Sequence, residues 1–250
     1  MEMRSFLLDS SGGKIPCRAF LPEGEAELAV LGVHGFAGDK ESSVLYKLAE
    51  ALCLRRGALV CFDFPAHGES RAPDSHLRVH RCMEDFLTVA DHIRQQFPGC
   101  RYGVFATSFG GYITLLCAER IPDFRMVLRA PAVTMAETFI RRIIPCPEEE
   151  FLTAGGAWCG FDRKMFVNAD FYRDLLDNPP RIPDCPLLIL HGDRDDVIPF
   201  GAVERIAKAH ANVALVPFPG ADHRFKGPGE AEKIVNTAMS WLENGREFGR

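Results

Sequence analysis

The fold of this chain is decided by the stretch Tyr102-Gly103-Val104-Phe105-Ala106-Thr107-Ser108-Phe109-Gly110-Gly111. A run of β-branched and aromatic residues stops at Ser108, and a helical pattern follows it. Small residues stand two positions before the serine and two and three positions after it. This pattern is typical of a serine on a sharp strand-to-helix turn, which exposes the hydroxyl above a sheet and points the next backbone N–H groups toward it. Ser108 is therefore our candidate nucleophile.

Short apolar runs alternate with amphipathic patterns on both sides of this stretch. We predict strands at Ile15–Phe20, Leu28–Val33, Ala58–Phe62, Tyr102–Phe105, Met126–Leu128, Leu187–Leu190 and Val213–Val216. We predict helices near Ser43–Leu54, Arg81–Phe97, Gly110–Arg120, Gly201–His210 and Glu230–Glu243. Such alternation is typical of an α/β fold with a mostly parallel central sheet flanked by helices. A hairpin in the region Phe6–Phe20 predicts one antiparallel sheet edge.

One segment departs from this alternation of strands and helices. Residues 131–184 contain no clear strand, yet they hold more aromatic side chains than a disordered linker would carry. We expect an ordered insertion of short helices packed over the sheet, within a single domain of residues 1–250. The aromatic side chains of this insertion are Phe139, Phe151, Trp158, Phe161, Phe166, Phe171 and Tyr172.

The composition limits the classes of protein that this chain can belong to. Its 250 residues are enough for one domain with a large core. The net charge of −5 and the absence of a basic stripe argue against a nucleic-acid or membrane-surface partner. We expect no membrane span and no secretory signal. Nine scattered cysteines without CxxC spacing favour free thiols in a reducing cytoplasm. A homodimer is compatible with the sequence.

A serine nucleophile requires a base, a group that orients the base, and N–H donors for the oxyanion. Among the eight histidines, His223 is best placed as the base, because it follows the last predicted strand and precedes the last predicted helix. We interpret His34, His67 and His191, which also lie beside strand ends, as residues that order their turns. The remaining four fall on polar or helical surfaces.

The acid and the oxyanion donors should lie in loops at strand ends. Three aspartates, Asp193, Asp195 and Asp196, follow one predicted strand, and the residues alone leave the choice among them open. The first expected oxyanion donor is the backbone N–H of Phe109, directly after the nucleophile. The second is the N–H of Phe36, because the preceding glycine lets the backbone turn close to a substrate carbonyl.

Together these motifs resemble the α/β-hydrolase superfamily over nearly the whole chain. His34-Gly35-Phe36 is similar to the oxyanion-loop motif of that family, and Asp63–Ser70 is similar to its D-x-x-G-x-G-x-S loop. The family pattern H-G-x-x-D-x-x-x-P aligns with residues 191–199 and implies that Asp195 is the acid that orients His223. The chain departs from the family at Ala106, Ala66 and Asp222, none of which removes a group that the mechanism needs.

Within the superfamily, the layout resembles small bacterial carboxylesterases of the cinnamoyl or feruloyl esterase type and monoacylglycerol lipases. The resemblance implies that residues 131–184 form a small cap over the serine, and that aromatic side chains of this cap line an apolar substrate pocket. Our candidates for that lining are Trp158, Phe161 and Phe166.

The resemblance implies a serine hydrolase that cleaves small carboxylic esters, with an apolar or aromatic acyl part, through an acyl-enzyme intermediate. A thioesterase, an amidase or peptidase, and an acyltransferase could use the same three residues, and a non-catalytic binding protein is a further alternative. The sequence contains no HExxH motif and no GxGxxG loop, so we expect no metal and no cofactor.

Overall fold

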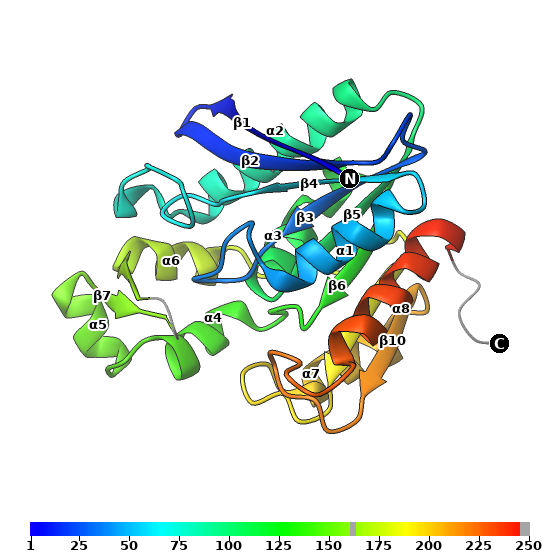
Figure 1. Ribbon diagram of the computed structural model, residues 1–250. Helices are drawn as coiled ribbons and strands as arrows, with labels where there is room; N and C mark the ends of the chain where they lie inside the picture. Colours follow the sequence, from blue (N-terminus) through cyan, green and yellow to red (C-terminus); the bar gives the residue numbers. More distant parts are fainter. Residues whose placement is uncertain (161–163, 246–250) are drawn as a thin grey trace.

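The computed structural model describes residues 1–160 and 164–245, which are built around an eight-stranded sheet (Figure 1). The strand order is β1-β2-β4-β3-β5-β6-β9-β10. The first two pairs in this order are antiparallel and the other neighbours are parallel, which confirms the predicted α/β class and the antiparallel edge. The strands are β1 (Glu2–Ser10), β2 (Gly13–Leu21), β3 (Leu28–Val33), β4 (Gly57–Phe62), β5 (Arg101–Thr107), β6 (Phe124–Arg129), β9 (Leu187–Gly192) and β10 (Val213–Phe218).

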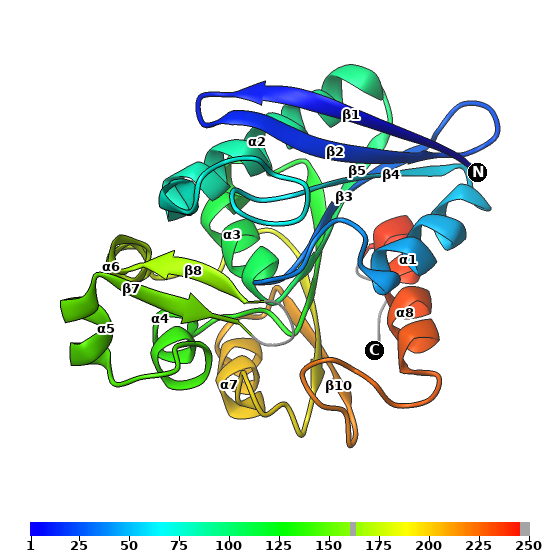
Figure 2. The same ribbon diagram turned by 60° about the vertical axis from the view of Figure 1, so that its left-hand side comes forward.

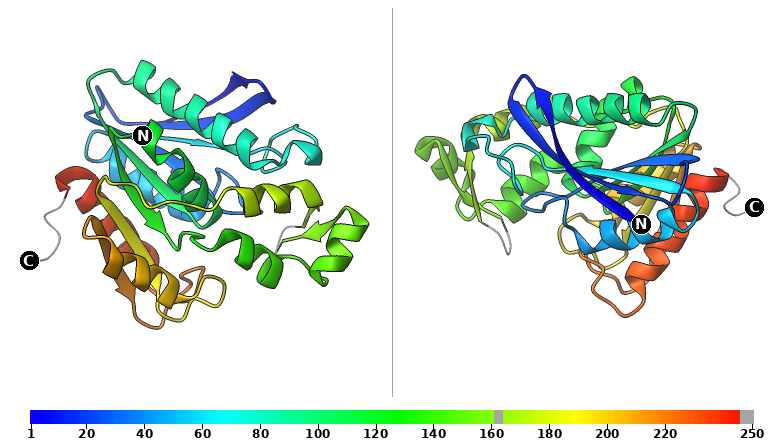
Figure 3. Two further views of the ribbon diagram at one scale, coloured as in Figure 1. Left: turned by 180° about the vertical axis from the view of Figure 1, so that it is seen from behind. Right: turned by 45° about the horizontal axis from the view of Figure 1, so that its top comes forward.

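Helices cover both faces of this sheet. The helices α1 (Ser43–Cys53) and α8 (Glu230–Asn244) contact each other on one face. The helices α2 (Val79–Gln96), α3 (Phe109–Cys117) and α7 (Phe200–Ala209) lie on the other face, which Figure 3 shows from behind. Within residues 1–160 and 164–245, none of the helices combines the length and apolar character that crossing a bilayer requires.

Side chains of the continuously apolar strands pack into two separate hydrophobic cores, one on each face of the sheet. Along β3, Ala29 and Leu31 pack into the core beneath α2 and α3, whereas Leu28 and Val30 pack into the core beneath α1 and α8. Successive side chains of a strand point to opposite faces of the sheet, so a central strand covered on both sides must be apolar at every position. This requirement explains why β3 was readily predicted from the sequence.

The segment between β6 and β9 forms a lobe beside the sheet (Figure 2). It contains a two-stranded antiparallel sheet that we did not predict, because each strand has only four residues and shows no clear periodicity. Gly155, with φ of 76°, caps the end of the preceding helix, and the first of these strands begins at the next residue, Gly156. The elements of the lobe are α4 (Met135–Thr138), a π-helical turn (Phe139–Ile143), α5 (Glu148–Ala154), β7 (Gly156–Cys159), β8 (Met165–Asn168) and α6 (Ala169–Asp177).

Candidate active site

Ser108 occupies a strained turn between β5 and α3. Its backbone angles are φ 50° and ψ −112°, a region that residues other than glycine rarely adopt. Its N–H donates to the Arg129 carbonyl at 2.9 Å, and its own carbonyl accepts from the N–H groups of Tyr112 and Ala132, both at 3.1 Å. Hydrogen bonds on both sides of the serine therefore hold it in this conformation.

The small residues after Ser108 have a packing reason. A Cβ added at Gly110 would lie 2.5 Å from the carbonyl oxygen of His34. A Cβ added at Gly111 would lie 2.9 Å from the Cβ of Pro131. The helix that follows the serine can therefore approach both neighbouring loops only because these two positions lack side chains.

Three side chains form a continuous chain of hydrogen bonds. Ser108 Oγ lies 3.0 Å from Nε2 of His223, and Nδ1 of the same imidazole lies 2.8 Å from Oδ2 of Asp195. Because a carboxylate only accepts, Nδ1 carries the hydrogen and Nε2 is left to accept from the serine hydroxyl. The three residues follow β5, β9 and β10, whose carboxyl ends meet at the same edge of the sheet. The structure thus brings together the three residues that the sequence proposed for these roles.

Asp195 is buried but fully hydrogen-bonded. Its Oδ1 accepts from the N–H groups of Val197 at 2.8 Å and Ile198 at 2.7 Å, and its Oδ2 lies 3.2 Å from Nε2 of His191. Burial opposes ionisation of the carboxyl, but the hydrogen bonds from His191 and His223 outweigh burial and hold the Asp195 pKa below its usual range. The carboxylate therefore stays charged beside the imidazole.

The other two candidate aspartates lie elsewhere. Asp193 accepts a hydrogen bond from the N–H of Gly220 at 2.6 Å and so ties β9 to the loop that carries the histidine. Asp196 lies on the wall of the cavity above Ser108. The geometry thus distinguishes among three aspartates that the residue pattern alone left equivalent.

The loop after β3 turns sharply beside Ser108. The Gly38 N–H donates to the Gly35 carbonyl at 3.0 Å, and Ala37 has φ of 58°. A Cβ added at Gly35 would lie 3.4 Å from the Cβ of Ser108, so the backbone of the turn lies against the serine. Phe36 in this turn and Phe109 both line the cavity that contains Ser108, and their rings are 6.1 Å apart.

The cavity above Ser108 has a volume of about 890 Å³. On the side of the lobe its walls include the apolar Met135 and Ile143 and the polar Thr138, and beside His223 they are charged. Sequence reasoning missed both apolar residues, because a single aliphatic side chain in an irregular segment gives no signal. Across the described ranges, no three His, Cys, Asp or Glu side chains are grouped so that they could hold a metal ion.

The structure does not bring the predicted aromatic lining to this cavity. Trp158 is 62% exposed and packs against Phe166, its cross-strand neighbour in the β7–β8 hairpin, and neither is among the described lining residues. Phe161 lies outside the described residues. Two other aromatic side chains of the lobe, Phe139 and Phe171, instead pack on the ring of Phe36, at centroid distances of 6.1 and 6.2 Å.

Arg129 is a cavity residue that sequence reasoning also missed. Its guanidinium lies 4.7 Å from the ring centre of Phe225 and donates to the carbonyl of Arg224 at 2.6 Å. Burial lowers the pKa of this guanidinium to about 10. The only available signal was a charged residue directly after the apolar run Met126–Leu128, just before the turn into the lobe.

The chain is similar to known hydrolases in both sequence and fold. A family model described as serine aminopeptidase, S33, matches residues 24–153. The chain is 23% identical to the monoacylglycerol lipase of Mycolicibacterium smegmatis, over 92% of this chain and 93% of that protein. It is also 23% identical to the human palmitoyl-protein thioesterase ABHD10, over 75% of this chain and 64% of that protein. The structure of Est1E from Butyrivibrio proteoclasticus with ferulic acid bound superimposes with a TM-score of 0.79 at 20% identity, covering 94% and 98% of the two chains.

Proposed function

Because the chain belongs to the serine aminopeptidase S33 family of α/β-hydrolases, we propose that it is a serine hydrolase that cleaves carboxylic esters through an acyl-enzyme. The observation that carries this proposal is the unbroken set of hydrogen bonds from Ser108 through His223 to Asp195. A serine hydroxyl is a weak nucleophile unless a positioned base removes its proton. In this arrangement the base and the group that orients it are both within hydrogen-bond distance.

In the first half of the proposed reaction, Ser108 Oγ attacks the ester carbonyl carbon while Nε2 of His223 accepts the hydroxyl proton. The carbonyl oxygen becomes an oxyanion, which the backbone N–H groups of Phe36 and Phe109 stabilise. Collapse of this intermediate breaks the bond to the alcohol oxygen, and His223 donates its proton to the departing alkoxide. Asp195 stabilises the imidazolium in the meantime without taking its proton.

In the second half, His223 removes a proton from a water molecule that attacks the acyl-enzyme carbonyl. The same two N–H groups hold the second oxyanion. Its collapse breaks the bond to Ser108 Oγ, which takes the proton back from the imidazolium. The products are a carboxylic acid and an alcohol, and the free serine is restored.

The preferred substrate is proposed to be a small ester with an apolar or aromatic acyl part. The apolar cavity wall formed by Met135 and Ile143 supports this choice. So do the names of two similar proteins, a monoacylglycerol lipase and an esterase with ferulic acid bound. All nine cysteines are free, which supports the proposed location in a reducing cytoplasm.

A thioesterase is the second candidate, favoured by the likeness to a palmitoyl-protein thioesterase, of which the chain spans 64%. An amidase or peptidase is favoured by the description of the matching family. The same three residues serve each of these reactions, since the leaving group is selected by the shape of the pocket. Matched ester, thioester and amide substrates with one acyl group would separate the three by their kcat/KM values.

Hydrolysis of short-chain p-nitrophenyl esters, combined with fluorophosphonate labelling, tests the proposal. We expect turnover by the purified protein and a phosphonyl adduct on the peptide that contains Ser108. The Ser108→Ala variant should lose both. Folded wild-type protein that neither turns over any of the acyl substrates nor takes up the label would instead favour a non-catalytic binding protein.

A further inference from the structure

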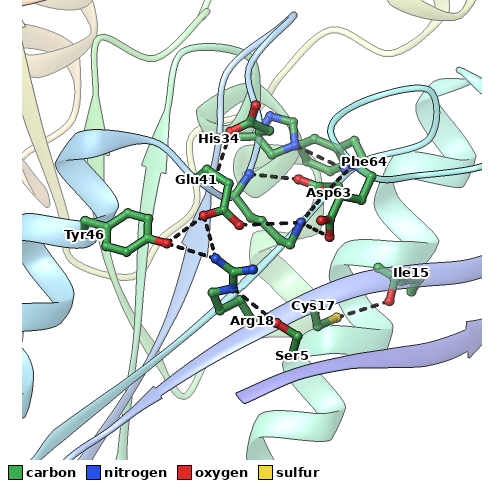
Figure 4. Close-up of polar contacts among 12 residues, drawn as sticks. Ser5, Ile15, Cys17, Arg18, His34, Glu41, Tyr46, Asp63 and Phe64 are labelled. Carbon is green, nitrogen blue, oxygen red and sulfur yellow. Dashed lines mark hydrogen bonds and ion pairs between the residues drawn. The ribbon is translucent and has the colours of Figure 1, made fainter. Parts of the chain in front are cut away.

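Two buried charges, Lys40 and Asp63, lie behind the turn that carries Phe36, and the exposed carboxylate of Glu69 contacts the lysine. Lys40 is 1% exposed, and its Nζ lies 2.7 Å from Oδ2 of Asp63 and 2.7 Å from Oε2 of Glu69. The side chain of Asp63 is fully buried. Figure 4 shows Asp63 and Phe64, which follow β4, facing the loop that begins at His34. Two loops that are distant in sequence are therefore joined by a charge pair out of contact with water.

Asp63 also binds the backbone of both loops. Its Oδ1 accepts from the N–H of Lys40 at 2.8 Å, and its Oδ2 accepts from the N–H of Glu69 at 2.9 Å. A Cβ at Gly68 would lie 2.2 Å from the Asp63 carboxyl carbon, so the backbone at Gly68 packs directly against the carboxylate and leaves no room for a side chain. The carboxylate thus fixes the last residue of the segment 34–40.

The first residue of that segment is attached to the same loop. The N–H of Phe64 donates to Nε2 of His34 at 3.2 Å, which requires that the hydrogen of this imidazole be on Nδ1. Nδ1 then donates to the carbonyl of Gly35 at 2.8 Å. The strained turn at Ala37 therefore lies between two anchors, and both anchors are on the loop after β4.

Stability alone does not account for a buried ion pair at this place. Removing two charges from water is costly, and apolar residues of similar size often stabilise a core at least as well. Unlike an apolar pair, this charged pair also accepts hydrogen bonds from two backbone N–H groups. Such bonds are directional, so they fix the position and orientation of the backbone in both loops.

We propose that Lys40 and Asp63 are positioning residues that hold the Phe36 N–H where an oxyanion forms. This inference rests on the proposed function, since it assigns a role within the oxyanion site of that function. Neither residue is among those lining the cavity with Ser108, so each acts through the backbone of the turn and not on the substrate.

The first experiment measures anchoring without any substrate. Hydrogen exchange of peptides covering residues 34–40 should be faster in the Lys40→Met variant than in the wild type, while peptides from β9 and β10 are unchanged. Arg94→Met is the matched control, because it removes a cation paired with Asp123 at 2.6 Å before β6, at the opposite end of the sheet from Ser108. Equal exchange of residues 34–40 in the wild type and Lys40→Met would overturn the proposal.

The second experiment compares an ester with its thionoester, in which sulfur replaces the carbonyl oxygen. The thio-oxyanion is a larger and weaker hydrogen-bond acceptor, so a misplaced N–H donor should matter less to it. We expect the kcat of Lys40→Met to fall about 10- to 100-fold on the ester with little change in KM, and several-fold less on the thionoester. An equal loss on both substrates would indicate general damage to the site and would also overturn the proposal.

Lys40→Met leaves the Asp63 carboxylate buried without its partner, and this alone destabilises the fold. The double variant Lys40→Met/Asp63→Asn removes both charges, so it should regain stability while keeping the altered ester-to-thionoester ratio. A double variant with the wild-type ratio and wild-type exchange would contradict the inference. If wild-type protein hydrolyses no acyl substrate, the proposed function fails, whereas exchange in residues 34–40 still decides whether Lys40 anchors the turn.

Discussion

Ser108 Oγ lies 3.0 Å from Nε2 of His223, although 115 positions of sequence separate the two residues. The contact exists because the loops after β5 and β10 emerge at one edge of a shared sheet. Both loops have backbone features that fix them, a positive φ at the serine and the hydrogen bond from Gly220 to Asp193 near the histidine.

Ser108→Gly should stabilise the fold while removing the nucleophile. The serine has φ of 50°, which costs a residue with a Cβ about 1–3 kcal/mol, and glycine adopts this region without strain. A gain of about 1 kcal/mol corresponds to a rise in Tm of about 2–4 °C in a chain of this size. Thermal unfolding measures it. Ser108→Ala is the control, since it is equally inactive but keeps the strain and should keep the wild-type Tm.

Asp195→Asn should lower the kcat for ester hydrolysis by about 10³- to 10⁴-fold with a small effect on KM. An amide cannot stabilise the imidazolium as a carboxylate does, and it can present an N–H to His223 that favours the wrong tautomer. Steady-state kinetics at pH 8 provide the measurement. Asp193→Asn, two positions away, should keep most of the activity. Similar losses in the two variants would argue against Asp195 as the acid.

Gly110→Ala should destabilise the protein by about 1–3 kcal/mol and reduce activity, because its Cβ would lie 2.5 Å from the His34 carbonyl oxygen. Relief of this contact must push the loop that carries Phe36 away from Ser108. Urea unfolding and ester kinetics measure the two effects. Gly201→Ala in α7 is the matched control, where the nearest atom would be 3.7 Å away, and a gain of about 0.5–1 kcal/mol is expected.

Asp85→Asn should stabilise the protein at neutral pH. Burial raises the pKa of the Asp85 carboxyl on α2 to about 6, despite an opposing hydrogen bond from Ser10. The folded state therefore binds a proton that the unfolded state releases near pH 4, and stability is lost as the pH rises from about 4 through 6. Since asparagine does not titrate, the variant should gain about 3 kcal/mol over the wild type at pH 8 and almost nothing at pH 4.

Urea unfolding at these two pH values measures the difference. A gain of equal size at both pH values would show that packing, and not ionisation, is responsible. Asp91→Asn, on the same helix but exposed, is the matched control, because it makes the same substitution without removing a buried carboxyl group.

Much of this fold could be predicted because its central strands are buried on both faces. The predicted strand Leu28–Val33 coincides with β3, and the other central strands differ only by one or two residues at their ends. The outermost strand, β1, begins earlier than the predicted hairpin, at Glu2. Its Met3 and Leu7 are exposed, so burial did not impose an alternating pattern there.

The cavity could not be predicted in the same way. Its lining depends on which side of each short element in the lobe faces Ser108, and four-residue strands leave that side undetermined. Trp158 and Phe166 are predicted to line the pocket because they are aromatic residues of the cap. Cross-strand pairing instead places them together on one face of the β7–β8 hairpin. The contact between Lys40 and Asp63 joins two loops. Such a contact produces no periodic pattern in the sequence, so it could not be predicted.

The order of the strands along the chain also has a consequence for biosynthesis. Ser108 and the turn at Phe36 belong to the first half of the chain, whereas Asp195 and His223 follow the last two strands of the sheet. A nascent chain on the ribosome therefore exposes its serine before the imidazole that hydrogen-bonds to it has been made. Only when β10 has paired with β9 can the Ser108 hydroxyl gain its partner, so activity would report that translation and folding of the final strand are complete.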